Sequence, residues 1–180
     1  MMHYGGKEMA AALRTVRNNT LQIASDIPED KYAWAPAPGS RTIQSLLAHI
    51  ALAPTLYEDL HRVQRITTVQ GYDFGAVIAK VSAEESKPRT KAELVELLRV
   101  EGERLASWLE SLSADSLAES YTDHMGQNPK SRLEGLLSVK EHEMHHRGQL
   151  MLIQRLLGIV PHLTRQMQER MAARAEAVTA

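Results

Sequence analysis

Three of the eight histidines in this chain lie within five positions, as His142, His145 and His146 of the run EHEMHHRGQ. In an α-helix, which turns by about 100° per residue, His142 and His146 lie about 40° apart on one face, with Cβ atoms roughly 6 Å apart. Two imidazoles at that spacing can bind one metal ion. His145 points to the other side of His142. The run therefore predicts a helix that offers two metal ligands.

A third candidate ligand, His49, lies on the apolar stripe of an earlier segment, together with Leu46, Ala53 and Leu56. Helical bundles build metal sites from inward-facing side chains on separate helices. Three neutral imidazoles and a water would form the open tetrahedral site typical of catalytic zinc, and nickel and other divalent ions also accept imidazole. The alternative interpretation of His49 is a core histidine that is hydrogen-bonded to a carbonyl.

Glu143 and Gln149 are candidates for residues that orient the ligands. The plainer interpretation is a solvated Glu143 and a Gln149 that only lines the helix seam. The run from His142 to His146 also matches H-E-x-x-H, the metalloprotease motif. A protease is disfavoured because position 152, where a further ligand of one protease class would fall, is Leu. The alternative carboxylate, Glu169, lies in a tail with little room for a catalytic subdomain.

The composition narrows the chemistry further. The 180 residues include no Cys, which excludes disulfides, iron–sulfur clusters, thiolate zinc sites and cysteine nucleophiles. A net charge of −1, from 21 basic and 22 acidic side chains, lacks the basic excess of nucleic-acid-binding proteins. No apolar run is long enough to span a membrane, and no secretory signal is evident. We expect one cytoplasmic domain over residues 1–180, with its core at 6–161.

The elements that must position these histidines are helices, because apolar residues recur at intervals of three and four and period-2 runs are missing. We expect an all-α four-helix bundle with an additional C-terminal helix or tail at 162–180, either exposed or packed on a partner. Pro54 should kink the second helix because it cannot donate a hydrogen bond to the carbonyl of Ile50. The predicted long helices are 6–25, 42–64, 90–112 and 132–157, with a short helix at 73–82, a linker at 82–89 and mostly loop at 113–131.

The remaining basic residues carry no motif. Arg14 and Arg17 are most simply part of a solvated helix face. The same reasoning predicts that the other histidines are exposed, namely His3, His61, His124 and His162.

Two runs resemble a known family. HEMHHRGQLMLIQRLLGIVP resembles the C-terminal signature of the DinB-like/YfiT-like metalloenzyme superfamily, and PEDKYAWAPAPGSRTIQSLLAHI is similar to its N-terminal signature. The resemblance extends from the first helix to Pro161. It implies a four-helix bundle in which His49, His142 and His146 bind a divalent metal, the same three residues that the helical spacing suggests.

The resemblance also implies an activity. The superfamily includes thiol S-transferases that use bacillithiol or mycothiol and a mycothiol-dependent maleylpyruvate isomerase, and homodimers are common in it. It implies a thiol S-transferase acting on small electrophiles; a hydrolase using metal-bound water and a non-catalytic stress-associated metal-binding module are the alternatives. Because the chain has no Cys, any sulfur at the metal must arrive with a low-molecular-weight thiol. Pro54 departs from the family pattern and weakens any transfer of substrate specificity.

Overall fold

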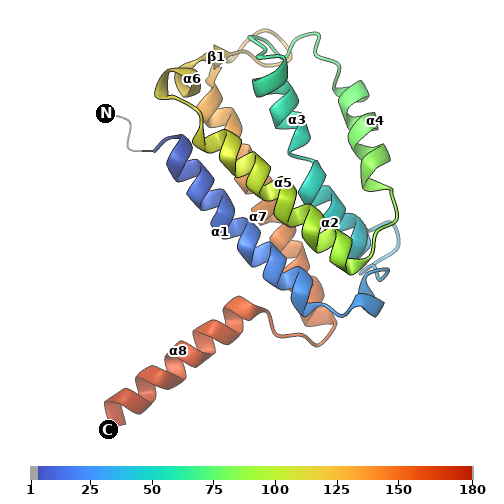
Figure 1. The fold of residues 1–180 in the computed structure, drawn as a ribbon, viewed down its shortest axis with the longest axis vertical. Helices are drawn as coiled ribbons and strands as arrows, with labels where there is room; N and C mark the ends of the chain where they lie inside the picture. Colours follow the sequence, from blue (N-terminus) through green and yellow to red (C-terminus); the bar gives the residue numbers. More distant parts are fainter. Residues whose placement is uncertain (1–3, 180) are drawn as a thin grey trace.

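The computed structural model describes residues 4–179 and confirms the predicted helical bundle. α1 packs against α5 and α7, and α2 packs against the same two helices (Figure 1). Within the described residues, no helix is long and apolar enough to cross a membrane. The four bundle helices are α1 (Gly6–Asp26), α2 (Ile43–Leu52), α5 (Lys91–Glu110) and α7 (Arg132–Leu156).

Side chains at the helix starts fix where these helices begin. Thr42 Oγ1 accepts a hydrogen bond from the backbone N–H of Ser45 at 3.1 Å and so caps α2. Capping boxes begin α5 at Thr90 and α7 at Ser131, where each hydroxyl accepts from a backbone N–H three residues on. These caps satisfy backbone donors that would otherwise have no partner. They set the start of both histidine-bearing helices.

The predicted second helix does not run unbroken to residue 64. It ends at Leu52, and the chain continues through the short helix α3 (Thr55–Glu58) and a π-helical turn η2 (Asp59–Val63). Pro54 is the physical reason, because a proline lacks the N–H that would bind the carbonyl of Ile50. Arg17 Nη2 donates to that carbonyl instead, at 3.3 Å.

The remaining elements connect the bundle helices. The prediction of mostly loop at 113–131 missed a short helix and an antiparallel pair of two-residue strands. The helix predicted at 73–82 extends three residues further. These connecting elements are η1 (Glu29–Lys31), α4 (Phe74–Glu85), α6 (Ala114–Ala118), β1 (Ser120–Tyr121) and β2 (Lys130–Ser131).

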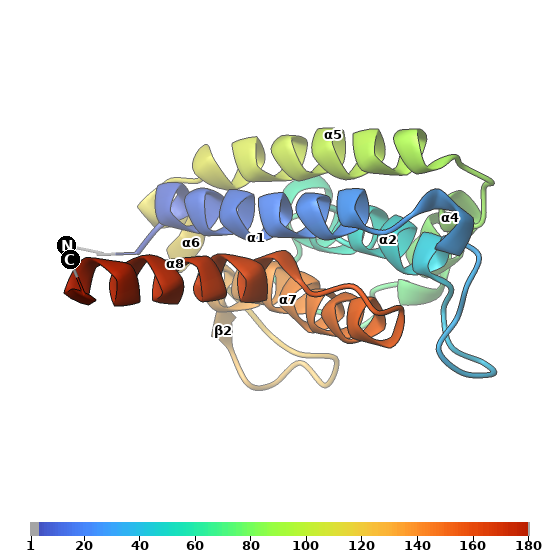
Figure 2. The same cartoon turned by 90° about the horizontal axis from the view of Figure 1, so that it is seen from below.

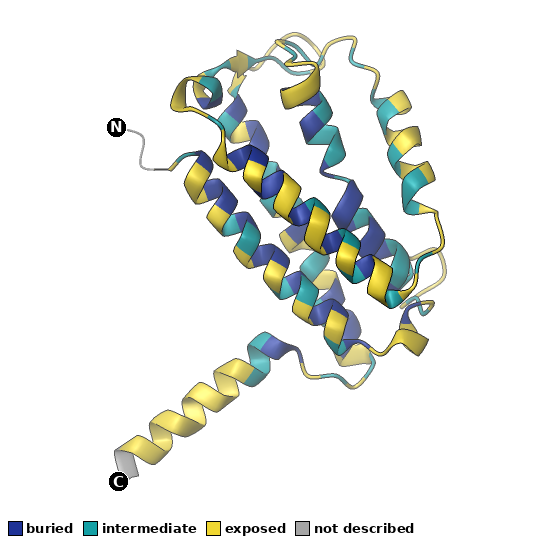
Figure 3. Cartoon of the chain, in the orientation of Figure 1, coloured by how far each residue is buried: buried dark blue, intermediate teal, exposed yellow. Residues whose placement is uncertain are grey.

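The predicted C-terminal helix is α8 (His162–Thr179). It leaves the end of α7 and extends away from the bundle (Figure 1), and in the view from below it is drawn in front of part of α7 (Figure 2). Its first turn is buried or half-buried, and residues 166–177 are exposed (Figure 3). Two large apolar side chains on this exposed part, Met167 and Met171, are 59% and 64% accessible.

The apolar core has two parts separated by a polar layer. One cluster includes Ile23 of α1 and Leu150 of α7, and the other includes Leu13 and Leu136 of the same two helices. Arg17, Thr20 and Glu143 occupy the intervening positions and are all buried.

The polar layer is a hydrogen-bonded network. Arg17 Nε and Nη2 donate to the two carboxylate oxygens of Glu143 at 2.9 and 3.0 Å, and Thr20 Oγ1 donates to the same carboxylate at 2.8 Å. Arg17 Nη1 donates to the carbonyl of Leu98 on α5. A Cβ on Gly102 would lie 2.7 Å from Arg17 Cγ, so only glycine leaves room for this side chain. The prediction of a solvated Arg17 is therefore wrong.

Two histidines expected at the surface are also buried. His61 Nδ1 lies 3.2 Å from Arg132 Nη1, and burial, together with that positive charge, lowers the pKa of His61 to about 4. His162 Nε2 lies 3.0 Å from Asn19 Oδ1. His124 is exposed, as expected, and His3 lies outside the described residues.

The buried Arg17–Glu143 pair predicts that replacing Arg17 lowers the free energy of unfolding far more than replacing Arg14, which lies on the same helix. Arg17→Met leaves the Glu143 carboxylate buried without its cation, and it should lower the free energy of unfolding by about 3–5 kcal/mol. Arg14→Met removes half-exposed ion pairs with Glu103 and Glu110 and should cost far less than Arg17→Met. Urea denaturation followed by circular dichroism measures both. Equal losses in the two variants would contradict the proposed importance of the buried pair.

Candidate metal centre

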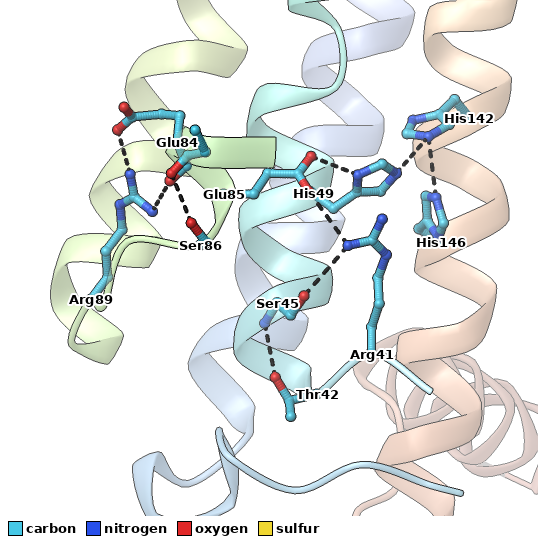
Figure 4. A network of polar contacts seen from close by, with 11 residues as sticks. Arg41, Thr42, Ser45, His49, Glu84, Glu85, Ser86, Arg89, His142 and His146 are labelled. Carbon is cyan, nitrogen blue, oxygen red and sulfur yellow. Dashed lines mark hydrogen bonds and ion pairs between the residues drawn. The ribbon is translucent and has the colours of Figure 1, made fainter. Parts of the chain in front are cut away.

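Three imidazoles from two helices converge at one point between α2 and α7. His49 Nε2 lies 3.1 Å from His142 Nε2, and His142 Nε2 lies 3.2 Å from His146 Nε2 (Figure 4). One ligand atom from each of the three residues lies within 4.8 Å of the others. The structure thus brings together all three histidines that the sequence analysis singled out.

The spacing and chemistry of these donors fit a divalent ion. Two nitrogens bound at 2.0–2.1 Å to a tetrahedral ion lie about 3.3 Å apart, close to the separations seen here. Burial, reinforced by the neighbouring imidazoles, lowers the pKa of His142 to about 4 and also lowers that of His146. Neutral imidazoles present lone pairs at neutral pH, as metal binding requires. Zinc and nickel both suit such a donor set.

Glu85 orients the first of these ligands. Its Oε1 lies 2.7 Å from His49 Nδ1, and only 9% of its side chain is exposed. A carboxylate on Nδ1 fixes the tautomer that directs the Nε2 lone pair toward the other histidines. The sequence analysis missed Glu85 because it ended the helix at 82 and placed this residue in a linker. No local spacing connects Glu85 to a histidine 36 residues earlier.

Gln149 orients a second ligand. Its Oε1 lies 2.8 Å from His146 Nδ1, one helical turn along α7, in the position expected for an orienting side chain. His145 is exposed and lies on the other side of Gln149, with 3.2 Å between His145 Nε2 and Gln149 Nε2. His142 Nδ1 is buried without a hydrogen-bond partner among the described residues, so this ring lacks the orienting side chain that His49 and His146 have.

Glu143 is neither solvated nor directed at the histidines. Glu143 is only 1% exposed, and its carboxylate binds Arg17 and Thr20 in the polar layer. The expectation that it orients a ligand directly is therefore corrected. Consecutive residues of a helix point about 100° apart, so the Glu143 side chain faces α1 while that of His142 faces α2.

Two pockets reach the histidines from different sides. The α4 pocket, of about 280 Å³, contacts His49, His142 and Glu85, and its apolar wall comes from α3 and α4 through Leu56, Tyr57, Val77, Ile78 and Val81. The α7 pocket, of about 330 Å³, contacts His146 and Gln149, and its apolar wall is formed by Pro36, Leu46, Leu152, Ile153 and Leu156.

Arg41 lines both pockets. It immediately precedes the cap of α2, and its side chain extends alongside the helix toward Glu85 and His49 (Figure 4). Its Nη1 lies 3.4 Å from Glu85 Oε2 and 3.4 Å from Ser45 Oγ. A guanidinium therefore lies at the boundary of two largely apolar pockets, beside the three histidines.

The sequence is similar to those of known proteins. The family model described as the DinB superfamily matches residues 12–150. The chain is 25% identical over 144 residues to the uncharacterized protein YjoA of Bacillus subtilis, an alignment that covers 79% of this chain and 84% of YjoA.

Solved structures share the fold. The crystal structure of the DinB-like YjoA superposes with a TM-score of 0.62 at 22% identity, covering 84% of this chain and 92% of YjoA. YfiT from Bacillus subtilis, described as a probable metal-dependent hydrolase with an unusual four-helix bundle topology, gives 0.65 at 15% identity over 88% and 91%. A mycothiol-dependent maleylpyruvate isomerase gives 0.61 at 16% identity over 82% and 61%.

The carboxylate behind His49 should strengthen metal binding. Glu85→Gln keeps the side-chain volume but loses the charge, and we expect the affinity for zinc to fall about 10–100-fold. Competition with a chromophoric chelator measures that affinity. Glu84→Gln is the matched control, because the neighbouring carboxylate pairs with Lys87 and Arg89 and is 42% exposed. An unchanged affinity in Glu85→Gln would show that this carboxylate does not support the site.

Proposed function

The chain belongs to the DinB superfamily, and on that premise we propose that it is a metal-dependent enzyme that transfers a low-molecular-weight thiol to a small electrophile. His49, His142 and His146 would hold one divalent ion, zinc or nickel, which would supply a Lewis acid for a thiol sulfur. The chain supplies no cysteine, so the sulfur that reacts belongs to a substrate.

The observation that carries the proposal is the pair of pockets at one three-histidine centre. A transferase that joins two organic substrates directly, without a covalent enzyme intermediate, must hold both at once with their reacting atoms adjacent. The α4 pocket reaches His49 and His142 while the α7 pocket reaches His146, so molecules in the two pockets meet at the same three side chains. Their apolar walls suit small organic molecules.

In the reaction, the thiol loses its proton to water and the sulfur lone pair forms a bond to the electrophilic carbon. The leaving group departs with the electrons of the bond that breaks. A bound divalent cation supplies the positive charge that lowers the pKa of the thiol. Glu85 and Gln149 hold two of the imidazoles in orientation.

The second candidate is a hydrolase that activates water at the same position, as the description of YfiT suggests for that protein. A hydrolase needs one organic substrate, so it does not require two separate pockets at the centre. A metal-binding module without turnover is the third interpretation.

An activity assay separates these functions. Zinc- or nickel-loaded protein should accelerate the reaction of small thiols with monobromobimane, which becomes fluorescent when a thiolate displaces its bromide. His142→Ala should lose stoichiometric metal, measured by inductively coupled plasma mass spectrometry, and lower this rate at least about 100-fold, because it removes the central ligand. His124→Ala, an exposed loop histidine, is the control and should keep both metal and rate.

The opposite outcomes are equally informative. Stoichiometric metal in His142→Ala would contradict the three-histidine site. Metal-dependent cleavage of para-nitrophenyl acetate without any thiol transfer would favour the hydrolase. Bound metal without either activity would favour the non-catalytic module.

We further propose that the chain forms a homodimer through α8, whose exposed part carries Met167 and Met171 one turn apart on one face. Burying that stripe against a second copy would remove apolar area from water. Light scattering after size exclusion should give a dimer mass for the native chain and a monomer mass for the double variant Met167→Glu, Met171→Glu. The control, Gln166→Glu with Gln168→Glu, adds the same charge beside the stripe and should stay dimeric. A monomeric native chain would contradict this arrangement.

A further inference from the structure

We propose that Arg41 binds a carboxylate on the thiol substrate, so that the enzyme selects thiols that carry a carboxylate a few bonds from the sulfur. This inference rests on the proposed function, because it names the class of thiol that the three-histidine centre receives.

The position of Arg41 relative to the histidines is the first argument. Arg41 lines the α4 pocket together with His49 and His142, and it lines the α7 pocket together with His146. A thiol whose sulfur binds at this centre extends into one of these two pockets. In either pocket, the rest of the molecule therefore shares the lining with the Arg41 guanidinium.

The second argument is the number of hydrogen bonds that Arg41 leaves unmade. Both of its contacts with described residues use Nη1, and both are long, at 3.4 Å to Glu85 Oε2 and to Ser45 Oγ. Nε and Nη2 have no acceptor in the part of the chain that the structure describes. The side chain is 45% exposed, so these donors are reachable. Two parallel N–H groups on a planar guanidinium match the two oxygens of a carboxylate.

The charge around the centre gives the third argument. Glu85 carries one negative charge, which offsets the positive charge of Arg41, and the neutral histidines add none. A divalent ion on the histidines then leaves a net charge of about +2 at the boundary of two pockets with apolar walls. A thiolate alone removes half of it. A thiolate that also carries a carboxylate neutralises the site, and Arg41 is the protein cation that contacts both pockets.

The test compares two thiols of similar size on cobalt-loaded protein. Mercaptopropionate carries the carboxylate and propanethiol does not, and the thiolate-to-cobalt charge-transfer absorbance reports the binding of each. We expect the native protein to bind mercaptopropionate at least about tenfold more tightly than propanethiol, because a charge-assisted pair is gained. Arg41→Gln should reduce this preference to about one, and Arg41→Lys should keep part of it because it retains the charge without the planar fork.

The comparison within each variant cancels any change in metal affinity, because both thiols are measured on the same loaded protein. Arg99→Gln is the control, since Arg99 is exposed, pairs with Glu96 and lines neither pocket. It should keep the native preference. Equal binding of both thiols to the native protein, or an unchanged preference in Arg41→Gln, would overturn the inference while leaving thiol binding at the metal intact.

If neither thiol produces the charge-transfer band, the thiol role in the proposed function fails, and a second measurement decides the carboxylate site by itself. Metal-free protein is titrated with phenylacetate and with phenylacetamide, and binding is followed by NMR. A preference for phenylacetate that is lost in Arg41→Gln would support a carboxylate site at Arg41. No such preference would overturn it.

Discussion

The guanidinium of Arg17 on α1 donates hydrogen bonds to each of the other three bundle helices. It extends from α1 to the Glu143 carboxylate on α7, to the Ile50 carbonyl on α2 and to the Leu98 carbonyl on α5. Two of these acceptors are direct sequence neighbours of metal-ligand candidates, because Ile50 follows His49 and Glu143 follows His142. A buried charge tolerates little displacement from its partners, since any loosened contact leaves it poorly solvated. The separation of the two histidine-bearing helices is therefore set by a group that touches none of the histidines.

Pro54 contributes to this arrangement from a distance. By ending the α2 hydrogen-bonding pattern, it leaves the Ile50 carbonyl without its helical donor, and Arg17 occupies that place. The same interruption lets the chain turn into α3 and η2, and Leu56 and Tyr57 of α3 line the α4 pocket. The interruption of the helix at Pro54 thus frees the Ile50 carbonyl to accept a hydrogen bond from Arg17. It also places α3 where its side chains line the α4 pocket.

The bundle helices and the three histidines could be predicted because their signals are local. A three-four apolar repeat and an i,i+4 histidine pair are both visible within one segment. Arg17 could not be separated from Arg14 on that basis, since both lie on α1 and only the glycine at 102 on a different helix makes room for one of them. The role of Glu85 could not be predicted for the same reason, because its partner His49 lies 36 residues earlier in the chain. The direction of the Glu143 carboxylate also depends on which helix packs on which side.

The helix α4 differs from the four bundle helices in that none of its residues is fully buried, yet it supplies both the carboxylate behind His49 and five of the eleven residues that line the α4 pocket. Its attachment is therefore weak compared with that of the core, and it is a segment expected to open at low free-energy cost. An ion held by His49 favours the docked position of α4 through Glu85, and a molecule packed on Val77 and Ile78 favours the same position. Thermodynamic linkage then requires each to tighten the binding of the other by the same factor. Helix α4 can in this way make occupancy of the pocket and retention of the ion cooperative, without any change in the four bundle helices.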